Sequence, residues 1–352
     1  MTVRLRPSMV ALPAYVPGRK VPGAVVLASN ESPFGLLPSV AGVLASHLAG
    51  VSRYPDMGAT RLVEAIAAHH GVEPARVAVG AGSVEVCGQL AAAAVETGDE
   101  VVFGWRAFEA YPIITAVAGG HAVKVPLTGT HVHDVDAMAA AVNDRTRLVF
   151  LCNPNNPTGT AVGVDDLRRL VDNMPEHVLV VIDEAYREYV DASVVPDAME
   201  LFADRPNVAV TRTFSKAYAL AGLRVGYCVA SPDVAAAVRK CQVPFSVSGL
   251  AQEAAIAALG DAEEVARRAK LTVGERERVR SALTDSGFDV PPSQANFVWL
   301  LLGEQAADFA ADCLAAGVVV RPFAGEGVRV TIGLPEENDR FLAAASTWAA
   351  VH

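Results

Sequence analysis

The chain reads VAVTRTFSKAYALAGLRVG over residues 208–226. Its apolar beginning predicts a buried strand that delivers Thr213, Ser215 and Lys216 into a loop. A second strand is expected to begin just after Arg224. Catalytic and phosphate-binding groups in α/β sheets gather at such carboxyl ends of strands. The Lys216 amine could form an imine with a phosphorylated aldehyde, while Ser215 and Arg224 bind its phosphate. The alternative is that Lys216 is simply exposed in a surface loop.

Strand-like and helix-like segments alternate on both sides of this stretch. Most of the short β-branched runs are nearly all apolar, which is typical of strands that are covered on both faces. Alternation with helices predicts an α/β fold built on a mostly parallel, seven-stranded sheet. The expected strands are 76–79, 100–103, 122–125, 148–151, 179–182, 208–211 and 225–229.

The pattern changes after about Pro244, which predicts a second, smaller α+β domain. We expect one long helical stretch over 249–286 and a final helix from about Glu336. Between them, strands are expected at 296–301, 318–321 and 328–332. The predicted organisation is an amino-terminal arm (1–30) that joins the small domain, a large domain (31–243) and a small domain (244–352).

Composition limits the class of protein. The 352 residues are 52% hydrophobic and 19% charged, which suits about two domains with large cores. The net charge of -10 argues against a nucleic-acid partner, because such a surface needs clustered Lys and Arg. An acidic protein that handles small molecules fits better.

Neither a membrane association nor a metal site is predicted. No apolar run approaches the ~18 residues of a membrane span, and the proline-interrupted amino terminus lacks a signal-peptide core. The 5 cysteines are scattered, without metal-ligand spacing. They indicate free thiols in a reducing cytoplasm.

A second strand carries an acidic side chain at its end, in the segment LVVIDEAY over 179–186. Asp183 follows four apolar residues, so it could emerge at the edge of the sheet and pair with the N–H of a heterocycle. Such pairing keeps a pyridinium protonated. Tyr186 lies close enough to offer its hydroxyl to the same ring. The alternative is that Asp183 caps the next helix.

Two further turns could serve the same ligand. In LVFLCNPNNPTG (148–159), a strand leads into a turn that fixes the amide of Asn156, although plain turns of this kind are common. In VAVGAGSVE (77–85), a glycine-rich turn opens a helix whose backbone N–H groups could bind an anion. A dinucleotide site is the alternative there, but Glu85 stands where its third glycine is expected. Trp105 and Phe108 could stack on a flat ring.

Together these segments make the chain resemble the fold-type I aminotransferases that depend on pyridoxal phosphate (PLP), in the histidinol-phosphate aminotransferase subgroup. The motifs that carry the resemblance span nearly the whole chain: SNESPFG (29–35), RYPD (53–56), NPNNPTG (153–159), DEAY (183–186), TFSKAYALAGLRVGY (213–227) and RVTIG (329–333).

The resemblance implies a role for each site residue. Lys216 would be the Schiff-base lysine, Asp183 would pair with the pyridine nitrogen, and Tyr186 and Asn156 would contact the phenolic oxygen. Arg329 would bind the substrate carboxylate. The remaining cofactor contacts would come from Ser83 and Val84 through their backbone, from Phe108 by stacking, and from Thr213, Ser215 and Arg224. The resemblance also implies a homodimer in which Tyr54 reaches the neighbouring subunit's site.

Within this subgroup, three segments look most like the aromatic amino acid aminotransferases: 105–112, 243–248 and 291–300. The expected reaction moves the amino group of phenylalanine or tyrosine to a 2-oxo acid such as 2-oxoglutarate by a ping-pong mechanism. Histidinol phosphate remains the alternative donor, because Arg329 could bind a phosphate as well as a carboxylate. Tyr15 and Phe34 are candidate pocket walls, or they pack in the ordinary way. A PLP-dependent lyase or decarboxylase and an NAD-dependent dehydrogenase are the rival enzymes.

Overall fold

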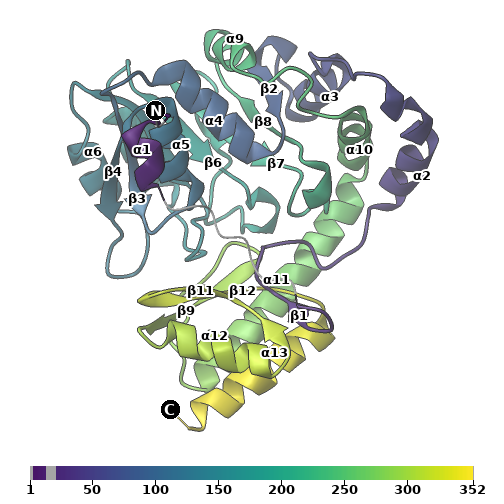
Figure 1. Ribbon diagram of the computed structural model, residues 1–352, viewed down its shortest axis with the longest axis vertical. Helices are drawn as coiled ribbons and strands as arrows, with labels where there is room; N and C mark the ends of the chain where they lie inside the picture. The colour runs from purple at the N-terminus through teal and green to yellow at the C-terminus, as the bar shows by residue number, and fades with distance from the viewer. Residues whose placement is uncertain (1–2, 13–20, 352) are drawn as a thin grey trace.

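The computed structural model describes residues 3–12 and 21–351. Its larger part is built on a seven-stranded sheet with the order β2-β8-β7-β6-β5-β3-β4 (Figure 1). Only β8 runs antiparallel to its neighbours, and the other adjacent pairs are parallel. The expected α/β architecture is therefore confirmed. In sheet order the strands are Val77–Gly80, Gly226–Val229, Val208–Thr213, Leu179–Asp183, Thr146–Cys152, Glu100–Trp105 and His121–Pro126.

Helices cover both faces of this sheet, which explains why its strands are apolar throughout. Leu148 and Phe150 of β5 lie in one buried cluster, together with residues of α4, α5 and α9. The alternate residues Val149 and Leu151 lie in a second cluster with α6 and α7. Successive side chains of a strand point to opposite faces, so both faces need apolar residues. These helices are α4 (Ser83–Ala94), α5 (Ala110–Ala118), α6 (Val135–Ala140), α7 (Val164–Asp172) and α9 (Pro232–Lys240).

The smaller part contains an antiparallel sheet with the order β11-β12-β9. A separate pair joins β1 near the amino terminus to β10, in parallel. The sequence predicted a single strand over 318–321, but it is divided at Val320 between two sheets. The elements are β1 (Val25–Val26), β9 (Phe297–Gly303), α12 (Ala306–Ala315), β10 (Val318–Val319), β11 (Arg321–Phe323), β12 (Glu326–Thr331) and α13 (Pro335–Ala349).

The single helix predicted over 249–286 is wrong at Asp261, where the structure has two helices, α10 (Gly249–Gly260) and α11 (Ala262–Asp285). Gly260 weakens the helix at this point. The Asp261 carboxylate also accepts hydrogen bonds from the backbone N–H and the hydroxyl of Ser39. The break is thus fixed by a residue more than two hundred positions away.

The connections between the two parts bear on the predicted domain boundaries, which stay predictions. Helix α10 packs against α2 (Pro38–His47) and α3 (Thr60–His70) of the larger part, and α11 then runs into the smaller part (Figure 1). Strand β1 joins the smaller part. The short helix α1 (Pro7–Ala11) lies instead beside α5, where Arg6 donates to the carbonyl groups of Ala116 and Val117.

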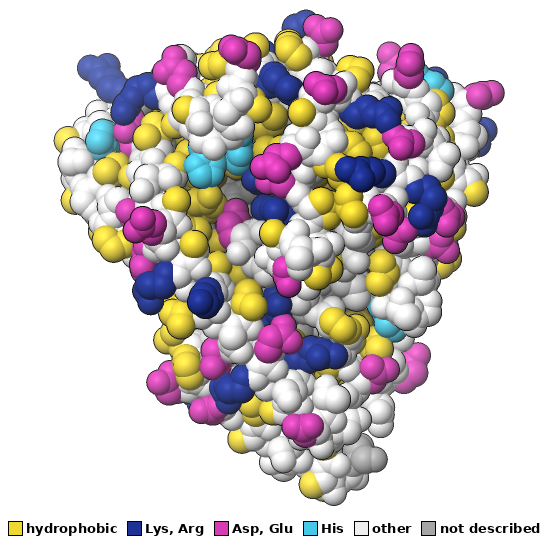
Figure 2. Space-filling model, turned by 180° about the vertical axis from the view of Figure 1, so that it is seen from behind, with side chains coloured by type: hydrophobic (Ala, Val, Ile, Leu, Met, Phe, Trp, Pro, Cys, Tyr) yellow, Lys and Arg dark blue, Asp and Glu magenta, His cyan; other side chains and the backbone are white. Residues whose placement is uncertain are grey.

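One face of the molecule carries both signs of charge. Acidic and basic side chains are interspersed on the face that Figure 2 shows. Within residues 3–12 and 21–351, no helix is both long and apolar enough to cross a membrane. The same residues contain no group of three or more His, Cys, Asp or Glu side chains arranged to hold a metal ion.

Candidate active site

A cavity of about 250 Å³ lies where the parallel strands end and the smaller part approaches them. The turns that follow β5, β6 and β7 contribute to its lining, as does β12 of the smaller sheet. Most of the residues predicted for the site meet here. Those that line the cavity are Ser83, Val84, Phe108, Asn156, Asp183, Tyr186, Thr213, Ser215, Lys216, Arg224 and Arg329.

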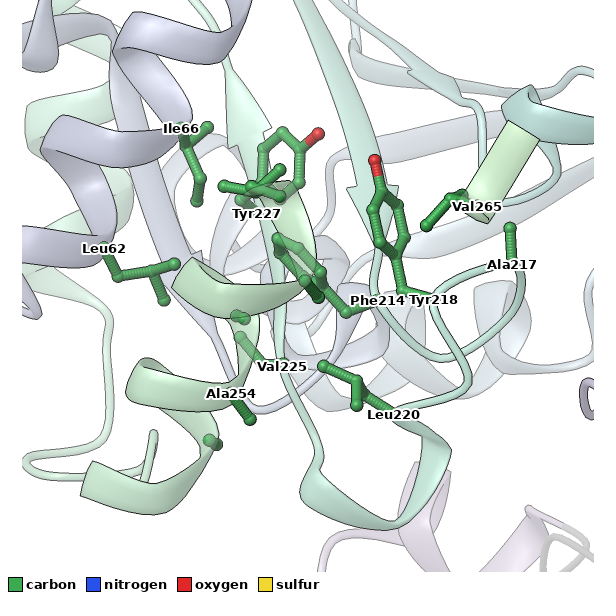
Figure 3. Packing of buried hydrophobic residues seen from close by; sticks show 14 of the residues in the cluster. Leu62, Ile66, Phe214, Ala217, Tyr218, Leu220, Val225, Tyr227, Ala254 and Val265 are labelled. Carbon is green, nitrogen blue, oxygen red and sulfur yellow. The ribbon is translucent and has the colours of Figure 1, made fainter. Parts of the chain in front are cut away.

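The loop that carries Lys216 is anchored from behind by apolar side chains. Phe214, Leu220 and Val225 are buried in the cluster that Figure 3 shows, packed with residues of α3 and α10. The Phe214 backbone also forms hydrogen bonds with Val225 and Leu220. Its N–H donates to the Val225 carbonyl (3.1 Å), and its carbonyl accepts from the Leu220 N–H (3.0 Å). The loop is therefore rigid at its base while Lys216 points into the cavity.

The Lys216 amine is partly removed from water. Its Nζ donates to the carbonyl of Ser29 at 3.2 Å. Burial and then the nearby Arg329 guanidinium lower its pKa to about 8, because both disfavour the charged ammonium. A larger fraction of this amine is neutral near neutral pH than for an ordinary lysine, which suits a nucleophile or base.

Asp183 ends β6 and is buried. It accepts hydrogen bonds from the Tyr111 hydroxyl (2.9 Å) and the Thr211 hydroxyl (3.1 Å). Burial raises the pKa of Asp183, and these two hydrogen bonds oppose that shift. The alternative that Asp183 caps a helix is wrong, because the next helical turn, η3 (Arg187–Tyr189), has Tyr186 at its N-cap position. A buried carboxylate held in this way suits a cationic N–H partner.

A polar network connects the rest of the cavity floor. Arg329 of β12 donates to the Asn156 side-chain oxygen (2.5 Å) and to the carbonyl of Ala28 (2.7 Å). The hydroxyl of Tyr186 accepts from the Asn30 amide at 2.9 Å, and burial raises its pKa. The smaller part and the amino-terminal segment thus both hold residues of the larger part in position.

The turn before α4 forms a cradle that fits an anion. Gly82 has φ +85°, and a Cβ there would lie 2.2 Å from an Arg224 Nη2 atom. A Cβ on Gly226 would lie 2.3 Å from the backbone nitrogen of Ser83. Arg224 also donates to the Ser215 hydroxyl at 3.2 Å. The helix N-terminus, a hydroxyl and a guanidinium therefore converge without intervening side chains, as a phosphate requires.

The two candidate stacking residues have different surroundings. Phe108 lines the cavity and packs edge-on against Tyr111. Trp105 does not line it, and its ring instead lies under the cations of Arg106 and Lys124, at 4.4 and 4.2 Å. Only Phe108 is therefore in place to cover a ring bound beside Asp183.

Three other predicted residues are not in this cavity. Tyr54 is 83% exposed and stacks on Phe245, with ring centres 4.6 Å apart. The Phe34 ring lies 5.5 Å from the guanidinium of Arg268 and is not among the cavity-lining residues, so it stays a prediction without support from this chain alone. Tyr15 lies outside the described residues.

Sequence reasoning missed several contributors. Tyr111 was not predicted, because nothing local links it to Asp183, 72 residues away. Asn30 belongs to the quoted SNESPFG motif, and that motif was the available signal for it. Arg321 lines the cavity together with Glu31, and Arg321 forms an ion pair with Glu109.

This fold, with a lysine, a buried carboxylate and an anion cradle at the strand ends, defines a class of enzyme that handles amino groups on a phosphorylated cofactor. The family model "Aminotransferase class I and II" matches residues 22–345. The chain belongs to this family and is an aminotransferase, which acts on amino acids and oxo acids. The dehydrogenase alternative is therefore wrong.

Known proteins resemble the chain over its full length. An aromatic amino acid aminotransferase of Thermobifida fusca is 56% identical over 348 residues, covering 98% of this chain and 97% of that protein. One from Rhodococcus erythropolis is 52% identical, covering 99% and 96%. The structure of histidinol-phosphate aminotransferase from Sinorhizobium meliloti in complex with PLP has a TM-score of 0.90 at 32% identity, covering 100% and 99%.

Proposed function

We propose that this aminotransferase transfers the amino group of an aromatic L-amino acid, phenylalanine or tyrosine, to a 2-oxo acid such as 2-oxoglutarate. The observation that carries the proposal is the 52–56% identity to aromatic amino acid aminotransferases over nearly the whole chain. The cavity is compatible with such a donor, because Arg329 in its lining offers a partner for the carboxylate.

The cavity residues fit PLP as the cofactor. The anion cradle of Ser83, Val84, Ser215 and Arg224 suits its phosphate. When bound, PLP supplies an aldehyde carbon for an imine and a ring that takes up the electrons of the broken Cα–H bond.

The residues that line the cavity support the remaining proposed roles. Asp183 holds the proton of the ring nitrogen, and Phe108 covers the ring face. Tyr186 and the Asn156 amide serve the phenolic oxygen, and Thr213 completes this wall. Lys216 Nζ would hold the cofactor covalently and, as a free amine, would take the proton from the Cα of the substrate. All these side chains line one cavity, which supports the assignments.

The lowered pKa of Lys216 predicts how cofactor attachment depends on pH. Only the neutral amine attacks an aldehyde, and its pKa of about 8 means that the neutral fraction grows as pH rises through 8. We expect the rate of covalent PLP uptake by the apoenzyme to rise between pH 6 and 8 and to level off above about pH 9. Rapid-mixing absorbance measures it. A rate that still climbs steeply near pH 10 would indicate an ordinary lysine.

Arg329 is proposed to bind the α-carboxylate of both substrates and so to orient the Cα–H bond. Arg329→Lys keeps the positive charge but loses the paired N–H donors of the guanidinium. We expect it to raise the KM for phenylalanine and 2-oxoglutarate by about 10- to 100-fold. Steady-state kinetics with each substrate varied in turn measures this. Unchanged KM values for both substrates would remove Arg329 from this role.

A homodimer is part of the proposal. Tyr54 lies on the surface among other exposed apolar side chains, which favours burial against a second copy. Val51 and Phe245, which are also exposed, line the same surface pocket as Tyr54. Tyr54 would then reach the neighbouring subunit's site. A cytoplasmic location also belongs to the proposal, and all five cysteines are free thiols, as a reducing compartment requires.

The donor preference tests the proposed function. We expect kcat/KM with 2-oxoglutarate as acceptor to be at least about tenfold higher for phenylalanine and tyrosine than for histidinol phosphate. The second candidate, a histidinol-phosphate aminotransferase, is favoured by the two arginines that line the cavity, Arg321 and Arg329. A preference for histidinol phosphate would establish that candidate. Formation of amine or elimination products in place of 2-oxo acid would indicate a lyase or decarboxylase.

A further inference from the structure

Two arginines stand side by side on the hairpin that closes the cavity. Arg321 of β11 and Arg329 of β12 are directly paired in register, and both line the cavity. Both guanidinium groups lie near the Phe323 ring, at 5.6 and 5.8 Å from its centre. Like charges placed directly opposite on neighbouring strands repel each other, so each needs a partner.

The two arginines hydrogen-bond to different kinds of group. Arg329 donates to the Asn156 side-chain oxygen and to the Ala28 carbonyl, which are both neutral. Arg321 instead donates to the carboxylate of Glu109 at 3.0 Å, and their side chains are only 14% and 32% exposed. Glu109 stands immediately before α5, one residue from the ring-covering Phe108.

We propose that Glu109 is a specificity-determining residue, because it occupies Arg321 with a carboxylate and makes the anionic end of a substrate side chain compete for that guanidinium. An uncharged aromatic ring has no such competition, so the Glu109–Arg321 pair favours aromatic donors over dicarboxylic and phosphorylated ones. A dicarboxylic oxo acid is still accepted by exchange of its distal carboxylate with Glu109. This inference rests on the proposed function, which it extends to the side-chain end of the substrate.

A second ion pair provides a matched control. Arg106 donates to both carboxylate oxygens of Glu326, and this pair also joins the larger part to the same hairpin. Neither Arg106 nor Glu326 lines the cavity. Both pairs link the two parts of the chain, but only the Glu109–Arg321 pair has a member, Arg321, in the cavity lining. Loss of a mere link between the parts would affect all substrates alike.

The experiment uses the PLP-loaded enzyme mixed with one donor and no acceptor, so that each donor is measured alone. The donors are L-phenylalanine, L-glutamate and 4-carboxy-L-phenylalanine. We expect Glu109→Gln to raise the efficiency for the two anionic donors relative to phenylalanine by about five- to tenfold, the range for a partly buried ion pair. Glu326→Gln is expected to leave these ratios within about twofold. Arg321→Gln should lower both ratios below the wild-type values.

Two outcomes would overturn the inference. The ratios could stay unchanged in Glu109→Gln, or Glu109→Gln and Glu326→Gln could lower the efficiency for all donors equally. The second result would make both pairs simple connections between the two parts. The wild-type preference between phenylalanine and histidinol phosphate is a separate measurement, so failure of the proposed function would be recognised independently.

Discussion

Lys216→Ala is expected to lower the turnover with phenylalanine by at least about a hundredfold, the low end for the loss of a general base. The same change should abolish the absorbance of covalently held cofactor. Among the residues that the structure describes, Lys216 is the only lysine that lines the cavity. Steady-state kinetics and absorbance spectra of the purified variant measure the two effects. The rigid base of the loop, with Phe214 and Val225 buried, should leave the fold intact.

Lys240→Ala serves as the control for this variant. Lys240 is exposed in the last turn of α9 and does not line the cavity. It should retain turnover within about twofold of the wild type, as expected for a surface substitution. A Lys216→Ala enzyme that kept the absorbance of covalently held cofactor would contradict the assignment of Lys216.

Asp183→Asn is expected to lower kcat by about 100- to 1,000-fold, the range for losing one preorganised electrostatic partner. Asparagine keeps the shape but has a single acceptor oxygen, so it can keep only one of the hydrogen bonds from Tyr111 and Thr211. It also removes the negative charge that stabilises a protonated ring nitrogen. Tyr111→Phe removes only one of the hydrogen bonds to Asp183 and should cost about tenfold. Kinetics and thermal unfolding of both variants would separate a chemical effect from loss of fold.

Comparing the loss of kcat in Asp183→Asn with that in Tyr111→Phe is the sharper test. An Asp183→Asn enzyme that retained kcat within about threefold would remove Asp183 from the proposed role, since its charge would then contribute under 1 kcal/mol to the barrier. A Tyr111→Phe enzyme that lost more activity than Asp183→Asn would instead make Tyr111 the residue that contacts the ligand. Equal thermal stability of the variants is needed for either conclusion.

The sheet was predictable because its strands are short, apolar on both faces and separated by helices. Strand β6, for example, begins at Leu179 as predicted and ends at Asp183, one residue after the predicted end. The convergence of Asp183, Asn156 and Lys216 followed from the same pattern, because parallel strands end at one edge. The sequence alone therefore predicts that these residues lie together.

Contacts between distant segments could not be predicted in this way. The hydrogen bond from Tyr111 to Asp183 and the ion pair of Glu109 with Arg321 join helix α5 to partners far along the chain. The break at Asp261 depends on Ser39 in the same manner. Local periodicity reports which face of an element is buried, but it does not report which residue lies opposite.

Lys216 is proposed to hold PLP, and the lysine to which the cofactor is attached can be located chemically. The sequence contains five lysines: Lys20, Lys124, Lys216, Lys240 and Lys270. Borohydride reduction of the PLP-loaded enzyme converts an imine into a stable secondary amine, which peptide mass spectrometry can assign to one of them. We expect the phosphopyridoxyl group on Lys216 alone. Its presence on any of the other four lysines in place of Lys216, or its absence from the protein, would show that Lys216 does not hold PLP.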